Sequence, residues 1–112
     1  MIVDGQEQAR FVAASILEHF GLETMLAADY QRAVDAFGSA ADNIGLVMLD
    51  LADMPTDPAE ALRPFRKLRP DVKFLFTRCA TADAASMDCG PILTKPYSAQ
   101  QLASAAREVL GG

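Results

Sequence analysis

Apolar residues occur in two kinds of pattern along the chain, as short continuous runs and as longer stretches with a helical period. Residues 45–49 and 72–76 are continuous runs, which are typical of strands buried on both faces of a sheet. Residues 6–20 and 99–110 repeat their apolar positions every three or four residues, which predicts amphipathic helices. We therefore expect strands and helices to alternate.

The complete pattern predicts five strands, each followed by a helical segment. The strands are expected at residues 1–3, 23–26, 45–49, 72–76 and 91–94. The helices are expected at residues 6–20, 30–37, 57–68, 82–87 and 99–110, and the fourth of them is stunted. This alternation predicts an α/β fold, with a doubly wound parallel sheet covered by helices on both faces.

Local signals mark several helix ends. Asp57 before Pro58 is a good helix start, and Ser98 with Gln101 forms a capping box. Gly21 follows the first helix at the position where a C-terminal cap belongs. Pro64 falls inside the third helix, where we expect it to kink the helix or force a restart.

Composition narrows the class of protein. The chain has 112 residues, of which 51% are hydrophobic, and this predicts one globular domain over residues 1–112. The net charge of −5 disfavours nucleic acid or an anionic membrane as the main partner, and it is compatible with binding a cation. No apolar run approaches the roughly 20 residues that span a bilayer, and no secretion signal is evident, so we expect a cytoplasmic protein. Cys79 and Cys89 are ten residues apart and His19 is the only histidine, which disfavours a disulfide framework or a zinc site.

Four chemically capable residues follow four different strands. They are Asp4, Asp50, Thr77 and Lys95. In parallel sheets the site lies beyond the carboxyl ends of the strands, so we expect these side chains to converge on one crevice. Two carboxylates there suit a hard cation such as Mg²⁺, and a carboxylate beside that cation can act as a nucleophile toward a phosphoryl group. A hydroxyl and an ammonium can then help to neutralise the phosphoryl oxygens.

At these residues the sequence resembles the receiver domain of bacterial two-component response regulators, the CheY-like family. Ile2-Val3-Asp4, Leu46-Val47-Met48-Leu49-Asp50 with Met54-Pro55, Phe74-Leu75-Phe76-Thr77 and Lys95-Pro96-Tyr97 carry the resemblance. It extends over nearly the whole chain. The resemblance implies a flavodoxin-like (βα)5 sandwich, with the five strands in the order 2-1-3-4-5.

The resemblance also implies a role for each site residue. Asp50 accepts a phosphoryl group from a histidine kinase or a histidine phosphotransfer protein, and Asp4 helps Asp50 to hold Mg²⁺. Thr77 and Lys95 contact the phosphoryl oxygens. Pro96 follows the lysine in a turn, usually with a cis bond. Such a domain is phosphorylated in signal transduction and also occurs in larger chains, and its slow self-dephosphorylation leaves its status as an enzyme open.

Several positions depart from the family pattern. Gly5 replaces the second of two adjacent acids, so we expect weaker Mg²⁺ binding, with Glu7 or Asp53 as possible substitutes. The loop after Asp50 is one residue longer than usual. Arg78 replaces a small residue, where it either obstructs the phosphoryl pocket or supplies charge to it. Ile92 replaces the aromatic residue of the usual switch, and the fourth helix is short.

These departures leave two interpretations open, a working receiver and a degenerate receiver that binds a protein or ligand without phosphorylation. Two enzyme classes with the same topology fit less well. Aspartate-nucleophile phosphatases need a second acid two residues after the first, whereas Asp53 is three residues from Asp50. A flavodoxin needs a phosphate-binding loop of Ser, Thr and Gly after the first strand, whereas this chain has Asp4-Gly5-Gln6-Glu7 there. The kinase, the output, the oligomeric state and any further domains are not determined by the sequence.

Overall fold

The computed structural model describes residues 1–55, 57–79 and 90–111. The stunted helix expected at residues 82–87, and Cys89, lie outside these ranges. The described strands form one parallel sheet in the order β2-β1-β3-β4-β5, which confirms the predicted fold class. Their bounds are β1 Ile2–Val3, β2 Leu26–Ala27, β3 Leu46–Asp50, β4 Lys73–Cys79 and β5 Ile92–Lys95.

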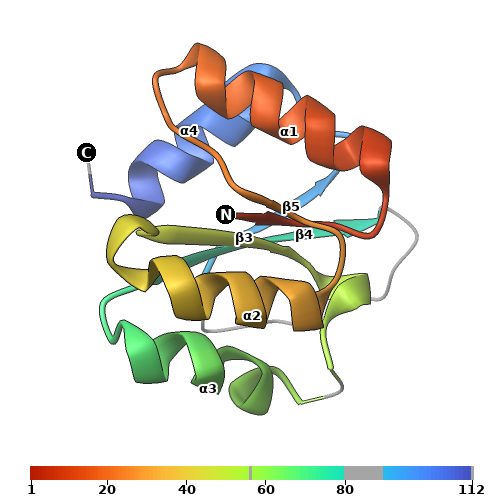
Figure 1. The fold of residues 1–112 in the computed structure, drawn as a ribbon. Coiled ribbons are helices and arrows are strands. Elements are labelled where there is room, and N and C mark those ends of the chain that lie inside the picture. Colours follow the sequence, from red (N-terminus) through yellow and green to blue (C-terminus); the bar gives the residue numbers. More distant parts are fainter. Residues whose placement is uncertain (56, 80–89, 112) are drawn as a thin grey trace.

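Helices cover both faces of the sheet. Their bounds are α1 Glu7–His19, α2 Tyr30–Ala40, α3 Pro58–Leu68 and α4 Ala99–Val109. Helices α1 and α4 pack on one face, and α2 and α3 pack on the other (Figure 1). None of the helices in the described ranges is both long enough and apolar enough to cross a membrane.

Strand β4 shows how the sheet divides the core into two clusters. Phe74 and Phe76 point to the α2–α3 face, where Phe74 packs edge-to-face on Phe65. Leu75 points to the α1–α4 face. Because successive side chains of a strand point to opposite faces, Thr77 shares the face of Leu75. Thr77 is paired in the register with Asp50, the last residue of β3, so its hydroxyl lies at the end of that strand.

The predicted helix caps are present. Asp57 accepts a hydrogen bond from the Ala59 N–H, and Ser98 and Gln101 form the complete capping box. Gly21 has φ +91°, a left-handed conformation that glycine adopts without steric cost at a helix end.

Helix α3 is continuous across Pro64, so the helix does not restart there, and Ala61, Leu62 and Phe65 on either side of it are buried in the core. One detail of the predicted secondary structure was wrong. The second strand is Leu26–Ala27 rather than residues 23–26, because β1 offers only two residues, Ile2–Val3, for pairing with it.

Candidate functional site

The carboxyl ends of four strands bring the four expected side chains together. Asp4 follows β1, Asp50 ends β3 beside Thr77 of β4, and Lys95 ends β5. Asp4, Asp50 and Thr77 are the buried polar residues among those described, with exposed fractions of 6%, 5% and 1%. Their polar groups therefore need hydrogen-bond partners, and the two carboxylates also need a positive counter-charge.

The ammonium group of Lys95 bridges the two buried carboxylates. Its Nζ lies 2.7 Å from Asp4 Oδ2 and 2.5 Å from Asp50 Oδ2. Burial alone would lower the pKa of Lys95, but hydrogen bonds to Asp4 and Asp50, together with their charges, raise it above its ordinary value. Lys95 is therefore a fixed positive charge at this site.

Asp4 and Asp50 are held in the same way. The Oδ1 of Asp4 accepts a hydrogen bond from the Gln6 N–H at 2.9 Å, and the Oδ1 of Asp50 accepts one from the Ala52 N–H at 2.9 Å. Each is an Asx turn, in which the carboxylate bonds the backbone two residues further along. One oxygen of each side chain thus fixes its orientation, and the other faces Lys95.

The Thr77 hydroxyl contacts the same oxygen of Asp50 as Lys95 does. It donates a hydrogen bond to Asp50 Oδ2 at 3.3 Å. A hydroxyl and an ammonium are therefore both close to one carboxylate oxygen. A group attached to Asp50 would have both donors nearby.

A third carboxylate, that of Asp53, approaches from the loop after β3. Its Oδ2 accepts a hydrogen bond from the Gly5 N–H at 2.9 Å. One oxygen from each of Asp4, Asp50 and Asp53 lies within 4.8 Å of the other two. Burial, followed by the charges of Asp50 and Asp4, raises the pKa of Asp53 although the Gly5 N–H opposes this shift. Glu7, the other suggested substitute, is exposed on the first turn of α1 and is not in this group.

The donor set suits a hard divalent cation. Carboxylate oxygens are the ligands that Mg²⁺ prefers, and they come from Asp4, Asp50 and Asp53. When ionised, these three side chains and the Lys95 ammonium carry two net negative charges, equal and opposite to the charge of one divalent ion. The residues present therefore fit the cation that the receiver resemblance implies.

Arg78 lies on the opposite face of β4 from Thr77, as strand alternation requires. Its Nε donates a hydrogen bond to Thr94 Oγ1 at 3.0 Å, and Arg78 pairs with Thr94 in the β4–β5 register. This described contact directs Arg78 to the α2–α3 side of the sheet. It favours neither of the two expectations for Arg78, obstruction of the carboxylate crevice or supply of charge to it.

Two other residues singled out in the sequence flank the site. The Lys95–Pro96 peptide bond is cis, as the resemblance implies. Ile92 at the start of β5 is half-buried and packs against the α2–α3 cluster, beside Phe76 in the register. A branched aliphatic side chain thus occupies the place where the receiver family usually has an aromatic switch residue.

Two residues to which the sequence analysis gave no role also border the site. Arg10 Nη1 donates a hydrogen bond to the backbone oxygen of Asp4 at 2.6 Å. Tyr97 is half-buried, and its burial raises the pKa of its phenol. Arg10 lies one turn into the helix that follows Asp4, and this position in the sequence could have predicted its contact with the Asp4 backbone.

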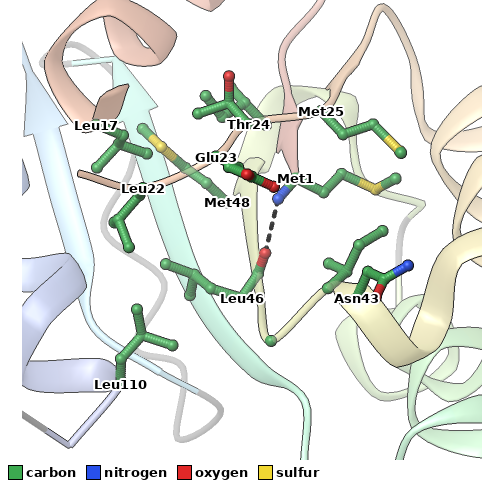
Figure 2. A pocket seen from close by; sticks show the side chains of 13 residues that line it. Met1, Leu17, Leu22, Glu23, Thr24, Met25, Asn43, Leu46, Met48 and Leu110 are labelled. Carbon is green, nitrogen blue, oxygen red and sulfur yellow. Dashed lines mark hydrogen bonds between the residues drawn. The ribbon is translucent and has the colours of Figure 1, made fainter. Parts of the chain in front are cut away.

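A separate pocket opens at the other end of the sheet. Met1 and Leu46, at the starts of β1 and β3, line it together with Leu22, Met25 and Leu110 (Figure 2). The Met1 backbone nitrogen donates a hydrogen bond to the Leu46 carbonyl at 2.8 Å across its floor. The pocket is mainly apolar and is distinct from the carboxylate crevice.

The fold and the strand-end residues together resemble those of receiver domains. A receiver domain protein from Clostridium thermocellum superposes with a TM-score of 0.80 at 19% identity, over 97% of this chain and 90% of that one. The receiver domain of the hybrid histidine kinase CckA superposes with a TM-score of 0.80 at 24% identity, over 97% and 95% of the two chains. These similarities establish the flavodoxin-like receiver fold.

This chain is also similar in sequence to a curated protein. The chain is 26% identical over 115 residues to the sensor kinase CckA of Brucella abortus (strain 2308), covering 98% of this chain. It spans only 12% of that kinase. No family model matches the chain. The resemblance to receiver domains inferred from the sequence is therefore confirmed.

Proposed function

We propose that this chain is a phosphoacceptor receiver domain of a two-component system, with Asp50 as the phosphorylated residue. The observation that carries the proposal is the position of the Lys95 ammonium, 2.5 Å from a carboxylate that is only 5% exposed. The donor is a phosphohistidine on a histidine kinase or a histidine phosphotransfer protein. This partner class comes from the resemblance to receiver domains.

The transfer needs little covalent chemistry from the protein. A carboxylate oxygen of Asp50 attacks the phosphorus, an O–P bond forms, and the P–N bond to the donor histidine breaks. The electron pair of that bond stays on the imidazole, which takes up a proton from solvent. Lys95 and Thr77 are placed to donate to oxygens of the transferred group, because both already contact Asp50 Oδ2.

Asp4 and Asp50 would hold Mg²⁺ beside the transferred group. When bound, the ion would supply positive charge to the phosphoryl oxygens as negative charge develops there. The support for this part of the proposal is the donor set of the crevice. The Asx turns of Asp4 and Asp50 fix both carboxylates before any ligand arrives.

One observation favours a second candidate function, a receiver that signals without phosphorylation. Ile92 fills the position of the usual aromatic switch and is packed against the core. In this interpretation Lys95 is a permanent neutralising partner of Asp50, and a partner protein recognises the resting surface.

Intact-mass measurement separates the two candidates. The purified protein is incubated with acetyl phosphate and Mg²⁺, and we expect it to gain the mass of one phosphoryl group. Asp50→Asn should abolish the gain, whereas Asp35→Asn on the exposed surface of α2 should retain it. Absence of a gain at high Mg²⁺, or a gain that survives Asp50→Asn, would overturn the proposal of a phosphoacceptor at Asp50.

A further inference from the structure

Gly5 and Asp53 are 48 residues apart in sequence, but the Asp53 carboxylate lies where a side chain at position 5 would begin. The Gly5 N–H donates to Asp53 Oδ2 at 2.9 Å. A Cβ atom at Gly5 would lie 2.9 Å from Asp53 Oδ1, closer than side chains normally approach. Any larger residue at position 5 must therefore displace the Asp53 carboxylate.

The loop after β3 delivers Asp53 to this space. Asp50 accepts a hydrogen bond from the Ala52 N–H and so caps a 3₁₀ turn at Leu51–Asp53. The turn brings the Asp53 side chain back over the end of β1, beside Asp4 and Asp50. The longer loop and the missing side chain at Gly5 are thus parts of one arrangement.

We propose that Asp53 is a metal ligand of this chain and takes the place of the acid absent at position 5. This inference rests on the Mg²⁺ site of the proposed function. Asp53 Oδ2 is held by the Gly5 N–H, which leaves Oδ1 directed into the space that a Cβ would fill. Asp53 then gives the cation a third carboxylate, alongside Asp4 and Asp50.

The simpler role for Asp53 is to accept the Gly5 N–H and tie the loop to β1. An asparagine oxygen would accept that hydrogen bond equally well, so this role needs no negative charge. The geometry argues against the simpler role, because one oxygen from each of three carboxylates lies within 4.8 Å of the other two, and holding three negative charges so close is electrostatically costly. A bound cation removes that cost.

The test is the dissociation constant for Mg²⁺, measured by calorimetry and by following the Gly5 amide resonance in an NMR titration. Asp53→Asn keeps a hydrogen-bond acceptor but removes the charge, and should weaken binding by at least about tenfold, the lower end for loss of a supporting group at a metal site. Glu7→Gln removes the same charge from the exposed first turn of α1 and should change binding by less than about twofold, as expected for a screened surface charge.

Gly5→Ala tests the position of the carboxylate without changing any charge. Its methyl group should push Asp53 aside and weaken Mg²⁺ binding as much as Asp53→Asn does. The double variant Gly5→Ala with Asp53→Asn should bind Mg²⁺ no more weakly than either single variant. Although Gly5 suggests a weakened site, Gly5→Asp alone should not tighten binding, because its Cβ meets Asp53. Gly5→Asp combined with Asp53→Ala should restore an affinity near that of the unmodified protein.

Each outcome decides the inference. Wild-type affinity in Asp53→Asn, or an equal loss in Glu7→Gln, would overturn the assignment of Asp53 as a ligand. If Asp53→Asn binds Mg²⁺ normally while Asp50 is still phosphorylated, only the role of Asp53 fails. If the unmodified protein binds Mg²⁺ through Asp53 but Asp50 is never phosphorylated, the role of Asp53 stands and the phosphoacceptor proposal fails.

Discussion

Replacement of Lys95 by methionine should strongly destabilise the fold, because it leaves two buried carboxylates without their shared counter-ion. One oxygen of Asp4 and one oxygen of Asp50 lie within 4.8 Å of each other. Two unit charges at that distance repel by about 3.5 kcal/mol at an effective dielectric constant of about 20. Loss of one partner from a buried ion pair costs about 3–5 kcal/mol. Since the Lys95 side chain is 21% exposed, solvent screening places the expected loss at about 3 kcal/mol.

Chemical denaturation and thermal unfolding of Lys95→Met measure this loss. About 3 kcal/mol is a large part of the 5–15 kcal/mol typical of a domain, and should lower Tm by about 13 °C. Lys73→Met removes an exposed lysine at the start of β4 and should change the free energy of unfolding by less than about 0.5 kcal/mol. Adding Asp50→Asn to Lys95→Met should recover most of the loss. A loss below about 1 kcal/mol in Lys95→Met would refute the claim that its ammonium offsets the buried charges.

Three further substitutions test the packing of the fold, all through the free energy of unfolding in denaturant. Gly90→Ala should cost at least about 1–3 kcal/mol, because its Cβ would lie 2.4 Å from the backbone oxygen of Phe74. Gly38→Ala in α2, where a Cβ meets nothing within 4 Å, should instead stabilise by about 0.5–1 kcal/mol. Equal effects of the two glycine substitutions would contradict this explanation. Tyr30→Phe removes the 2.6 Å hydrogen bond to the Ala61 oxygen that joins α2 to α3, and should cost about 1 kcal/mol; no measurable loss would show that water replaces this bond without cost.

The fold was predictable because its signals are local and repeated. Residues 45–49 and 72–76 are apolar at consecutive positions, as strands covered by helices on both faces require. Capping residues such as Asp57 and Ser98 mark helix starts within a few positions of the observed ones. The second strand was misplaced because its length depends on the two residues that β1 offers, which is a tertiary property.

The proximity of Asp4, Asp50, Thr77 and Lys95 was predictable for a different reason. Parallel strands end at the same edge of a sheet, so residues that follow strands must lie near one another whatever their separation in sequence. The identity of the contacts was not predictable. The bridging of both carboxylates by Lys95 depends on side-chain lengths and on the Asx turns that orient each acid.

The role proposed for Asp53 shows where sequence reasoning stops. In the sequence, Gly5 suggests a lost ligand for which Glu7 or Asp53 could substitute, and nothing in the sequence chooses between them. In the structure, the 3₁₀ turn places the Asp53 carboxylate where a side chain at position 5 would otherwise begin. A side chain at position 5 would therefore require the Asp53 carboxylate to turn away from its present position. Glycine at position 5 leaves that carboxylate room beside Asp4 and Asp50, so Gly5 and the loop that carries Asp53 are explained together.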